Sequence, residues 1–227
     1  MKNYLFAGLF YMLVVAGSFG QQEKMLGDFK TLKVYDRIEV ALIKSDVNKV
    51  VLKGKYTDDV VIVNKNGTLK IRMSLQKLFD GDETSVELYY KHIDVIDVNE
   101  GAFVGSNEVF NQFDLKLHAQ EGGSIKLQVE NITYLETKAI TGGVVRVSGT
   151  AKNQDIAINT GGSYLGSQLQ SNQANVIIQA AGEAHIFAQE FVDAKVRAGG
   201  TVYVYGNPKE LKERTVLGGQ VIIKDNN

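Results

Sequence analysis

Glycine pairs recur through the second half of this chain at an almost constant spacing. The second residues of six pairs or near-pairs lie 20, 19, 20, 18 and 19 residues apart: Gly122-Gly123, Gly142-Gly143, Gly161-Gly162, Ala181-Gly182, Gly199-Gly200 and Gly218-Gly219. A degenerate copy, Gly101-Ala102, precedes them by 21 residues. A fixed period of this size is typical of a solenoid, in which each repeat is one coil that buries its apolar side against its neighbours. The spacing therefore constrains the shape of the molecule much more than its activity.

The residues on both sides of each pair alternate between apolar and polar. Two positions after the second residue stand Val104, Ile125, Val145, Tyr164, Ala184, Val202 and Val221, and two positions before it stand Val98, Ala119, Ala139, Thr160, Ala180, Ala198 and Leu217. Alternation of period two indicates strands, so each coil is predicted to hold a strand, a glycine corner and a second strand. Parallel pairing of equivalent strands predicts an all-β fold, a right-handed parallel β-helix with coils of about 18–21 residues.

Glycine suits these corners for two physical reasons. A tight bend needs backbone torsions that residues with a Cβ avoid, and close approach between coils leaves no room for a side chain. Helix-pair solenoids have longer repeats and neither glycine pairs nor strict alternation, which disfavours them. A twisted antiparallel sandwich is the remaining alternative.

The region before the repeats has a different pattern. It holds short alternating segments separated by polar turns, and Asn66-Gly67 is a strong hairpin signal. These segments cover 29–35, 37–44, 49–54, 60–63, 68–73 and 86–90. Residues 21–95 are therefore predicted to form an N-terminal strand-rich cap or irregular first coils, ahead of β-helix coils over 96–227, within one continuous domain of about 29–224. Residues 75–84 are predicted to be an exposed loop.

The first twenty residues have the features of a secretory signal peptide. Lys2 gives a positive start, an uncharged run covers 4–16, and Ser18 and Gly20 place small residues at the −3 and −1 positions of a cleavage site. An uncleaved membrane anchor is the alternative. No second apolar stretch reaches the roughly 18 residues of a membrane span. The mature chain is therefore predicted to be exported, without a transmembrane segment, to the periplasm or to the cell surface or extracellular space.

Composition narrows the choice of partners. A net charge of −1 and a pI of about 6.3 disfavour nucleic acid as a partner. The chain has no cysteine, and its three histidines, His92, His118 and His185, stand at unrelated positions of the repeat. We therefore expect no metal site and no cofactor. Without disulfides, an exported chain depends on its core and its backbone ladders for stability.

The chain resembles a bacterial family, the head GIN domain of putative auto-transporter adhesins. The similarity rests on the signal segment followed by the strand pair 29–34 and 37–42, then 49–54 and 66–71, and on the closing segment 197–208 with its final Gly218-Gly219. It spans about Phe29 to Lys224, and the segment 197–208 is its most specific part. The resemblance implies an exported β-helical domain whose biochemical role is uncharacterised. Ala181 departs from the usual glycine, which we expect to allow a tight corner at some strain.

The columns that should face outward were compared with those of enzymes built on β-helices. Such enzymes cleave polysaccharides with carboxylates, or with Asp-bound calcium, that project from neighbouring coils. The four columns at three and five residues on either side of the second glycine hold no pair of acidic residues. Asp155 and Asp193 are interpreted as solvated acids near strand starts. The columns therefore predict no catalytic residues, with a polysaccharide lyase or hydrolase as the alternative.

One outward strip is rich in aromatic and apolar residues. After the corners of the last coils it brings together Leu165, His185, Phe187, Tyr203, Tyr205 and Ile222. These six residues, called the aromatic patch below, could be cross-coil stacking that only stabilises the sheet, a protein interface or homo-oligomer contact, or a glycan-binding surface. In earlier coils the same strip is basic, with Lys126 and Arg146 adjacent, and these cations would suit acidic glycans.

These observations predict an exported, non-catalytic β-helical domain at the bacterial cell envelope. Its expected role is adhesion, or binding of a glycan or an envelope protein. A polysaccharide-active enzyme and a purely structural envelope protein are the alternatives.

Overall fold

The computed structural model describes residues 22–224, and the predicted signal peptide lies outside the described residues. Nineteen strands and three 3-10 turns follow one another along this part of the chain. The strands are β1 (Gln22–Met25), β2 (Thr31–Val34), β3 (Glu39–Lys44), β4 (Lys49–Gly54), β5 (Val60–Lys65), β6 (Thr68–Met73), β7 (Thr84–Tyr90), β8 (Val95–Val98), β9 (Phe103–Asn111), β10 (Asp114–Gln120), β11 (Ser124–Ile140), β12 (Val144–Asn159), β13 (Ser163–Gly166), β14 (Leu169–Ile178), β15 (Glu183–Phe187), β16 (Phe191–Val196), β17 (Thr201–Tyr205), β18 (Glu210–Thr215) and β19 (Gln220–Ile223). The turns are η1 (Thr57–Asp59), η2 (Leu75–Lys77) and η3 (Gly81–Glu83).

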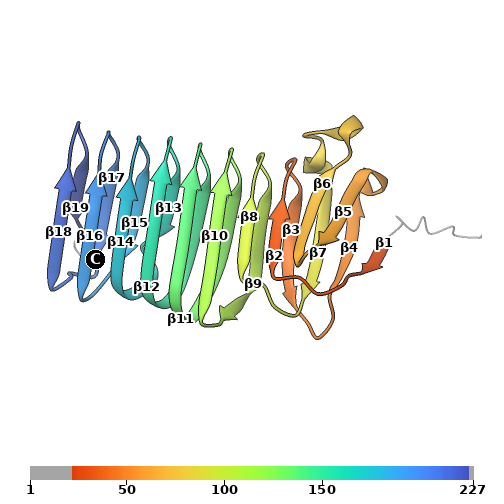
Figure 1. Cartoon of the computed structure of the whole chain (residues 1–227), viewed down its shortest axis with the longest axis horizontal. Helices are drawn as coiled ribbons and strands as arrows, with labels where there is room; N and C mark the ends of the chain where they lie inside the picture. The colour runs from red at the N-terminus through yellow and green to blue at the C-terminus, as the bar shows by residue number, and fades with distance from the viewer. Residues whose placement is uncertain (1–21, 225–227) are drawn as a thin grey trace, which may run out of the picture.

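The strands coil into a solenoid with two facing sheets, and its coils stack along the long axis of the molecule (Figure 1). The sheet called the back sheet below, which faces the viewer in Figure 1, holds the strand that precedes each corner: in stacking order β5, β6, β2, β8, β10, the second halves of β11 and β12, β14, β16 and β18. The front sheet holds the strand that follows: β1, β4, β7, β3, β9, the first halves of β11 and β12, β13, β15, β17 and β19.

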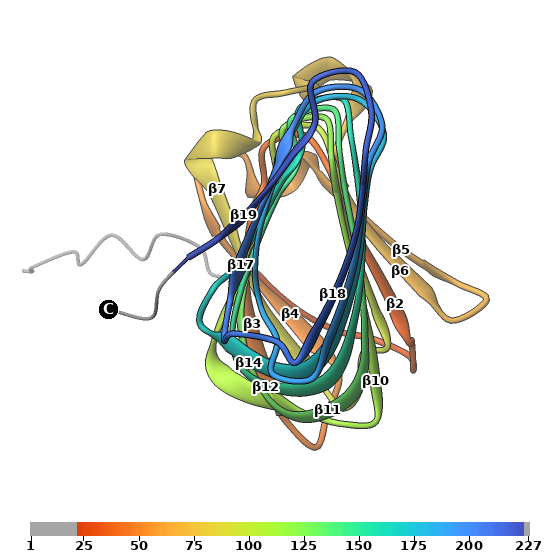
Figure 2. The same ribbon diagram turned by 90° about the vertical axis from the view of Figure 1, so that its left-hand side faces the viewer.

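Equivalent strands pair in parallel from β2 and β3 to the last coil, and the repeat predicted this pairing for the coils from β8 onward. Ile125 lies opposite Val145, which lies opposite Tyr164, and all three side chains are buried. Viewed along the stack, the coils overlay in one flattened outline (Figure 2). The prediction of an all-β solenoid of parallel coils is confirmed, and the antiparallel sandwich is wrong.

The two glycines of a corner have different surroundings. Gly142 has a φ of +73°, and a Cβ added there would meet no atom within 4 Å. Gly143 has no positive φ, but an added Cβ would lie 2.0 Å from the backbone oxygen of Ala119 in the preceding coil. The first glycine therefore provides the turn conformation, and the second allows the close approach of the coils. Ala181 adopts a φ of 50°, which confirms the strain expected where alanine replaces the glycine.

The N-terminal part contains both coils and antiparallel strands. β2 pairs in parallel with β6 on one side and β8 on the other, and β3 does the same with β7 and β9. The coil β2–β3 thus lies between the coils β6–β7 and β8–β9, out of chain order. β1, β4 and β5 pair antiparallel with their neighbours. This region therefore combines parallel and antiparallel pairing, and its division from the later coils near residue 95 stays a prediction.

The segment between β6 and β7 is mostly exposed, as predicted for residues 75–84, and it contains the two 3-10 turns η2 and η3. Although Leu75 and Phe79 are exposed, Gly81 is buried. The buried carboxylate of Asp36 accepts hydrogen bonds from the backbone N–H groups of Met73 (2.9 Å) and Phe79 (3.5 Å). Asp36 therefore fixes this segment to the corner of the coil β2–β3.

Candidate ligand-binding face

The aromatic patch predicted from the sequence lies on the front sheet in two adjacent rows. In the first row, Leu165 of β13, His185 of β15, Tyr203 of β17 and Ile222 of β19 are successive register partners. In the second row, Phe187 of β15 pairs with Tyr205 of β17. All six side chains are half-buried, and those of Leu165, His185, Phe187 and Tyr203 alternate with buried neighbours. The structure therefore brings the predicted residues together on one outer surface.

The rings of the aromatic patch also contact one another. The His185 and Tyr203 rings stack with centroids 4.5 Å apart, and those of His185 and Tyr205 lie 6.3 Å apart. The Lys224 ammonium lies 5.1 Å from the centroid of the Tyr203 ring. Stacking across coils stabilises the sheet and also holds the rings rigidly. The structure therefore places a preformed set of rings on a surface that cannot easily deform.

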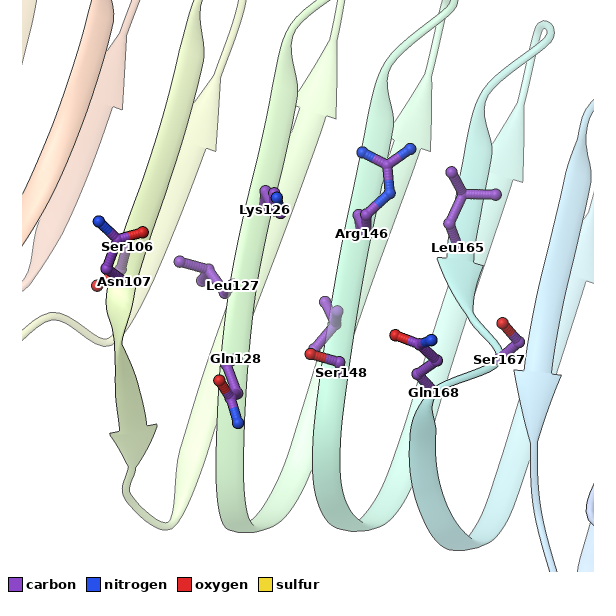
Figure 3. A pocket seen from close by; sticks show the side chains of 11 residues that line it. Ser106, Asn107, Lys126, Leu127, Gln128, Arg146, Ser148, Leu165, Ser167 and Gln168 are labelled. Atoms are coloured by element: carbon purple, nitrogen blue, oxygen red, sulfur yellow. The ribbon is translucent and has the colours of Figure 1, made fainter.

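The predicted basic strip continues the first row toward the N-terminus. Lys126 of β11 is the register partner of Arg146 of β12, which is the partner of Leu165. Both cations are exposed, and neither forms an ion pair within the part of the chain that the structure describes. They line a depression of about 450 Å³ on the front sheet, in which Figure 3 shows Lys126, Arg146 and Leu165 in one row.

Hydroxyl and amide groups make up most of the remaining lining. They come from four neighbouring coils: Ser106, Asn107, Gln128, Ser148, Ser167 and Gln168. Figure 3 shows Gln128, Ser148 and Gln168 in a second row beside the cations. The depression, called the polar groove below, therefore offers many neutral donors and acceptors around two positive charges.

Local irregularities on both sides of β11 and β12 shape the polar groove. In β9 the register shifts so that Gly105 opposes Lys126 but Val109 opposes Gln128, which leaves 106–108 as a bulge. On the other side, β13 ends at Gly166 and β14 resumes at Leu169, so Ser167 and Gln168 form a turn. A bulge re-aims side chains and kinks a strand. The sequence columns did not predict the contributions of Ser106, Asn107 and Gln168, because these residues lie outside the regular register. The only sequence signal for Ser106 and Asn107 is the longer spacing of 21 residues in the first repeat, and Gln168 has none.

A second depression of about 490 Å³ adjoins the polar groove and shares Ser106, Asn107 and Lys126 with it. Its lining includes the acidic residues Glu39, Glu87 and Glu108. Lys53 forms an ion pair with Glu87, and the backbone N–H of Lys44 donates to Glu108. The front sheet thus changes from acidic at β3 and β7, through basic at β11 and β12, to aromatic at β15 and β17.

The back sheet carries an acidic pair that the sequence columns missed. Glu136 of β11 is the direct register partner of Asp155 of β12, and both side chains point outward beside a depression of about 310 Å³. The expectation that no acidic residues pair on the outer faces is therefore wrong. Glu136 and Asp155 each stand seven residues before the second glycine of the following corner, whereas the sequence columns reached only five residues from it.

The environment of Glu136 favours the ionised carboxylate. The Lys138 ammonium (2.7 Å) and the Lys116 ammonium (3.0 Å) outweigh partial burial and lower the pKa of Glu136 to about 2. Asp155 accepts a hydrogen bond from the amide of Asn175 at 2.8 Å. A glycosidase needs one carboxyl group whose pKa is raised so that it can donate a proton. Glu136 has the opposite electrostatics.

The other candidates for chemistry are dispersed. His118 lies on the back sheet and His185 on the front sheet, while His92 contacts Asp94 near the N-terminal end. Burial lowers the pKa of His118, and the nearby Lys138 ammonium adds to this effect. Asp193, interpreted as a solvated acid, instead has a mostly buried side chain that pairs with Lys195 (2.9 Å) and Arg214 (3.4 Å). Within residues 22–224, no three His, Asp or Glu side chains are grouped to hold a metal ion, and no helix is long and apolar enough to cross a bilayer.

A comparison with protein families matches residues 28–208 to the model of one family, described as putative auto-transporter adhesin, head GIN domain. A comparison with curated proteins finds no match. The matched region covers most of the solenoid, from the residue before Phe29 to Pro208.

Solved structures share the fold at low sequence identity. A putative adhesin from Bacteroides fragilis has a TM-score of 0.79 and 16% identity, and the match covers 91% of this chain and 96% of that one. A putative lipid binding protein from Parabacteroides distasonis has a TM-score of 0.67 and 16% identity over 92% and 96% of the two chains. A putative adhesin from Parabacteroides merdae has a TM-score of 0.63 and 16% identity over 93% and 98%. These likenesses establish the solenoid fold.

Proposed function

Because the chain belongs to the family of putative auto-transporter adhesins with a head GIN domain, we propose that it is an exported, non-catalytic domain that binds carbohydrate at the bacterial cell envelope. The front sheet is the proposed binding surface. The observation that carries this proposal is the continuity of the aromatic patch with the polar groove in one row of register partners, from Lys126 to Ile222. Rigid rings suit the faces of sugars, and the polar lining suits their hydroxyl groups.

The exposure of the aromatic patch favours a polar ligand over a protein interface. All six residues are half-buried, and none belongs to the strongly exposed apolar side chains of the molecule. The central residues of stable protein interfaces are large side chains that become fully desolvated on binding, and a half-buried ring has less surface left to lose in this way. A sugar ring needs only one accessible ring face and hydrogen-bonding groups beside it. The patch therefore fits carbohydrate better than a homo-oligomer contact.

The acidic pair on the back sheet is the observation that favours an enzyme. Glu136 and Asp155 stand on neighbouring coils beside a depression, as carboxylates do in polysaccharide-cleaving β-helices. The two lysines that neutralise Glu136 argue for a structural ion-pair cluster instead. Turnover of a polysaccharide by the purified chain, lost in both Glu136→Gln and Asp155→Asn, would replace the binding proposal with the enzyme.

A glycan array tests the aromatic patch with a matched control. The double variant Tyr203→Ala/Tyr205→Ala removes two rings from the proposed surface, and Phe113→Ala/Tyr134→Ala removes two exposed rings that contact each other elsewhere. Loss of the stacking of a nucleic-acid base on an aromatic ring costs about 1–3 kcal/mol. On the same scale for a sugar ring, we expect at least about tenfold weaker retention for the first variant only. Thermal unfolding and size-exclusion chromatography verify the fold and the oligomeric state.

Two outcomes contradict the proposal. If both double variants retain glycans like the parent chain, the aromatic patch only stabilises the sheet. If Tyr203→Ala/Tyr205→Ala instead converts an oligomer to a monomer without changing glycan retention, the patch is a contact between copies of the chain.

A further inference from the structure

We propose that the polar groove is a subsite for the carboxylate groups of an acidic polysaccharide. This inference rests on the proposed carbohydrate binding of the front sheet and adds the chemical class of the ligand. Lys126 and Arg146 would contact the carboxylates, while the sugar chain continues along the row toward the aromatic patch. The ligand would therefore run along the coil-stacking direction, across the strands.

The two cations of the groove differ from most of those on the back sheet. From β2 to β18 of that sheet, a carboxylate lies within 3.4 Å of Lys33, Lys116, Lys138, Lys195 and Arg214. At its N-terminal end, β5 and β6 carry cations that form no ion pair in the described chain: Lys65, Lys70 and Arg72. Lys126 and Arg146 have no carboxylate partner within the described chain. The nearest outward residues on the same strands, Gln128 and Ser148, are neutral. Two like charges on adjacent strands repel each other unless an anion lies between them. A bound carboxylate supplies that anion, and the Arg146 guanidinium can bind it with two hydrogen bonds.

The neutral lining of the groove selects for a sugar polymer among polyanions. Serine hydroxyls and the amides of Asn107, Gln128 and Gln168 can both donate and accept, as sugar hydroxyls do. Nucleic acids and other dense polyanions are bound by many cations, typically with six or more phosphate contacts. The groove holds only two cations, which matches a polymer with one carboxylate per sugar.

The charges of the front sheet give the ligand a direction. The carboxylates of Glu39, Glu87 and Glu108 on the N-terminal side of Lys126 would repel an anionic chain. On the other side, Leu165, His185 and Tyr203 follow Arg146 in the same row. The Glu183 carboxylate is the exception there and lies 3.7 Å from the His185 ring nitrogen. At about 4.8 Å per coil, the row from Lys126 to Ile222 extends roughly 24 Å, enough for several sugar rings.

The test measures binding of the folded chain to polygalacturonate, a carboxylated polysaccharide, with dextran as the neutral polymer and inorganic polyphosphate as the non-sugar polyanion. Lys126→Gln/Arg146→Gln removes the two groove cations. Lys152→Gln/Arg197→Gln removes two exposed cations that also lack ion pairs in the described chain but lie outside the groove. We expect polygalacturonate to bind more tightly than either other polymer. The groove variant should bind it about tenfold more weakly, while the control stays within about twofold.

Each other result overturns the inference. The carboxylate subsite is wrong if polygalacturonate does not bind, if the two double variants weaken binding equally, or if dextran binds more tightly. If polyphosphate binds more tightly than polygalacturonate, the groove is a general anion site instead. The aromatic variant separates this inference from the proposed function. If Tyr203→Ala/Tyr205→Ala weakens polysaccharide binding but the groove variant does not, the front sheet binds carbohydrate without a carboxylate subsite. If only the groove variant weakens binding, the carboxylate subsite is supported and the aromatic patch does not bind the polysaccharide.

Discussion

Corners such as Gly142-Gly143 divide two requirements between two glycines, whereas Gly182 and Gly200 each combine a positive φ with a close approach to the preceding coil. Gly142 has a positive φ in open space, whereas Gly143 faces the Ala119 carbonyl of the preceding coil. Two reasons for glycine at a corner, the turn conformation and the close approach of the coils, could be inferred from the sequence. The sequence did not indicate which glycine of the pair meets which requirement. The non-glycine residues that precede the doublets show that a Cβ is tolerated at positive φ, since Thr141 and Thr160 adopt φ values of 49° and 50°. Lack of space is therefore the stricter requirement.

This difference predicts unequal effects of two neighbouring alanine substitutions. Gly142→Ala places a Cβ at positive φ in open space and should lower the free energy of unfolding by about 1–2 kcal/mol. Gly143→Ala places a Cβ 2.0 Å from a backbone oxygen, so two coils must separate, and the loss should reach about 3 kcal/mol or more. Urea unfolding of the two variants beside the parent chain measures both values. Equal losses, or a larger loss for Gly142→Ala, would contradict this assignment.

At the scale of the strands, ion pairs organise the outer surface of the back sheet. Lys116, Glu136 and Lys138 form one cluster on β10 and β11. On β2 and β8, burial of Asp97 opposes ionisation, but hydrogen bonds from Lys33, Asn99 and Gln120 outweigh it and lower the pKa of Asp97. These contacts join successive coils, so their energy depends on the ionisation of a few carboxylates.

The cluster predicts a loss of stability in acid. Because the pKa of Glu136 is lower in the folded state (about 2) than its ordinary value of 4.5, the unfolded chain binds a proton first as the pH falls. The stabilisation is complete above about pH 4.5 and is lost between there and about pH 2. Glu136→Gln should lower the thermal midpoint at neutral pH and reduce its fall in this window. Glu130→Gln, which removes an exposed carboxylate without an ion pair in the described chain, is the control; an identical pH profile for Glu136→Gln and the parent would contradict the prediction.

The strands also show how much of the fold the sequence could predict. Period and alternation identified the coils from β8 onward, because each has a glycine corner. The coil β2–β3 was not recognised as part of the stack, since its corner uses Asp36 and Arg37 at φ values of 59° and 61°. Its insertion between later coils depends on the pairing of β2 and β3 with strands far away in the sequence, and a local sequence pattern does not predict such pairing. The repeat period was enough to predict the rows of the aromatic patch. The polar groove could not be predicted in this way, because it depends on a bulge in β9 that interrupts the period.

At the scale of the whole molecule, the solenoid gives a long, stiff surface whose character changes along its length. The N-terminal end is covered by β1, β4 and β5, whereas β18 and β19 end the stack of described coils (Figure 1). β18 carries Glu210, Lys212, Glu213 and Arg214, and such charges discourage pairing with a further strand. Within the described chain, the front sheet has two adjacent cations without ion pairs and a run of rings in one row, and we place ligand binding there.

A crystal structure of the chain with an oligogalacturonate of six or more sugars tests this account most directly. The account predicts that the sugar chain lies along the front sheet across the strands, with a sugar face on Tyr203 or Tyr205 and carboxylates within hydrogen-bonding distance of Lys126 and Arg146. Sugar bound beside Glu136 and Asp155 on the back sheet, or against the last coil at β18 and β19, would contradict it.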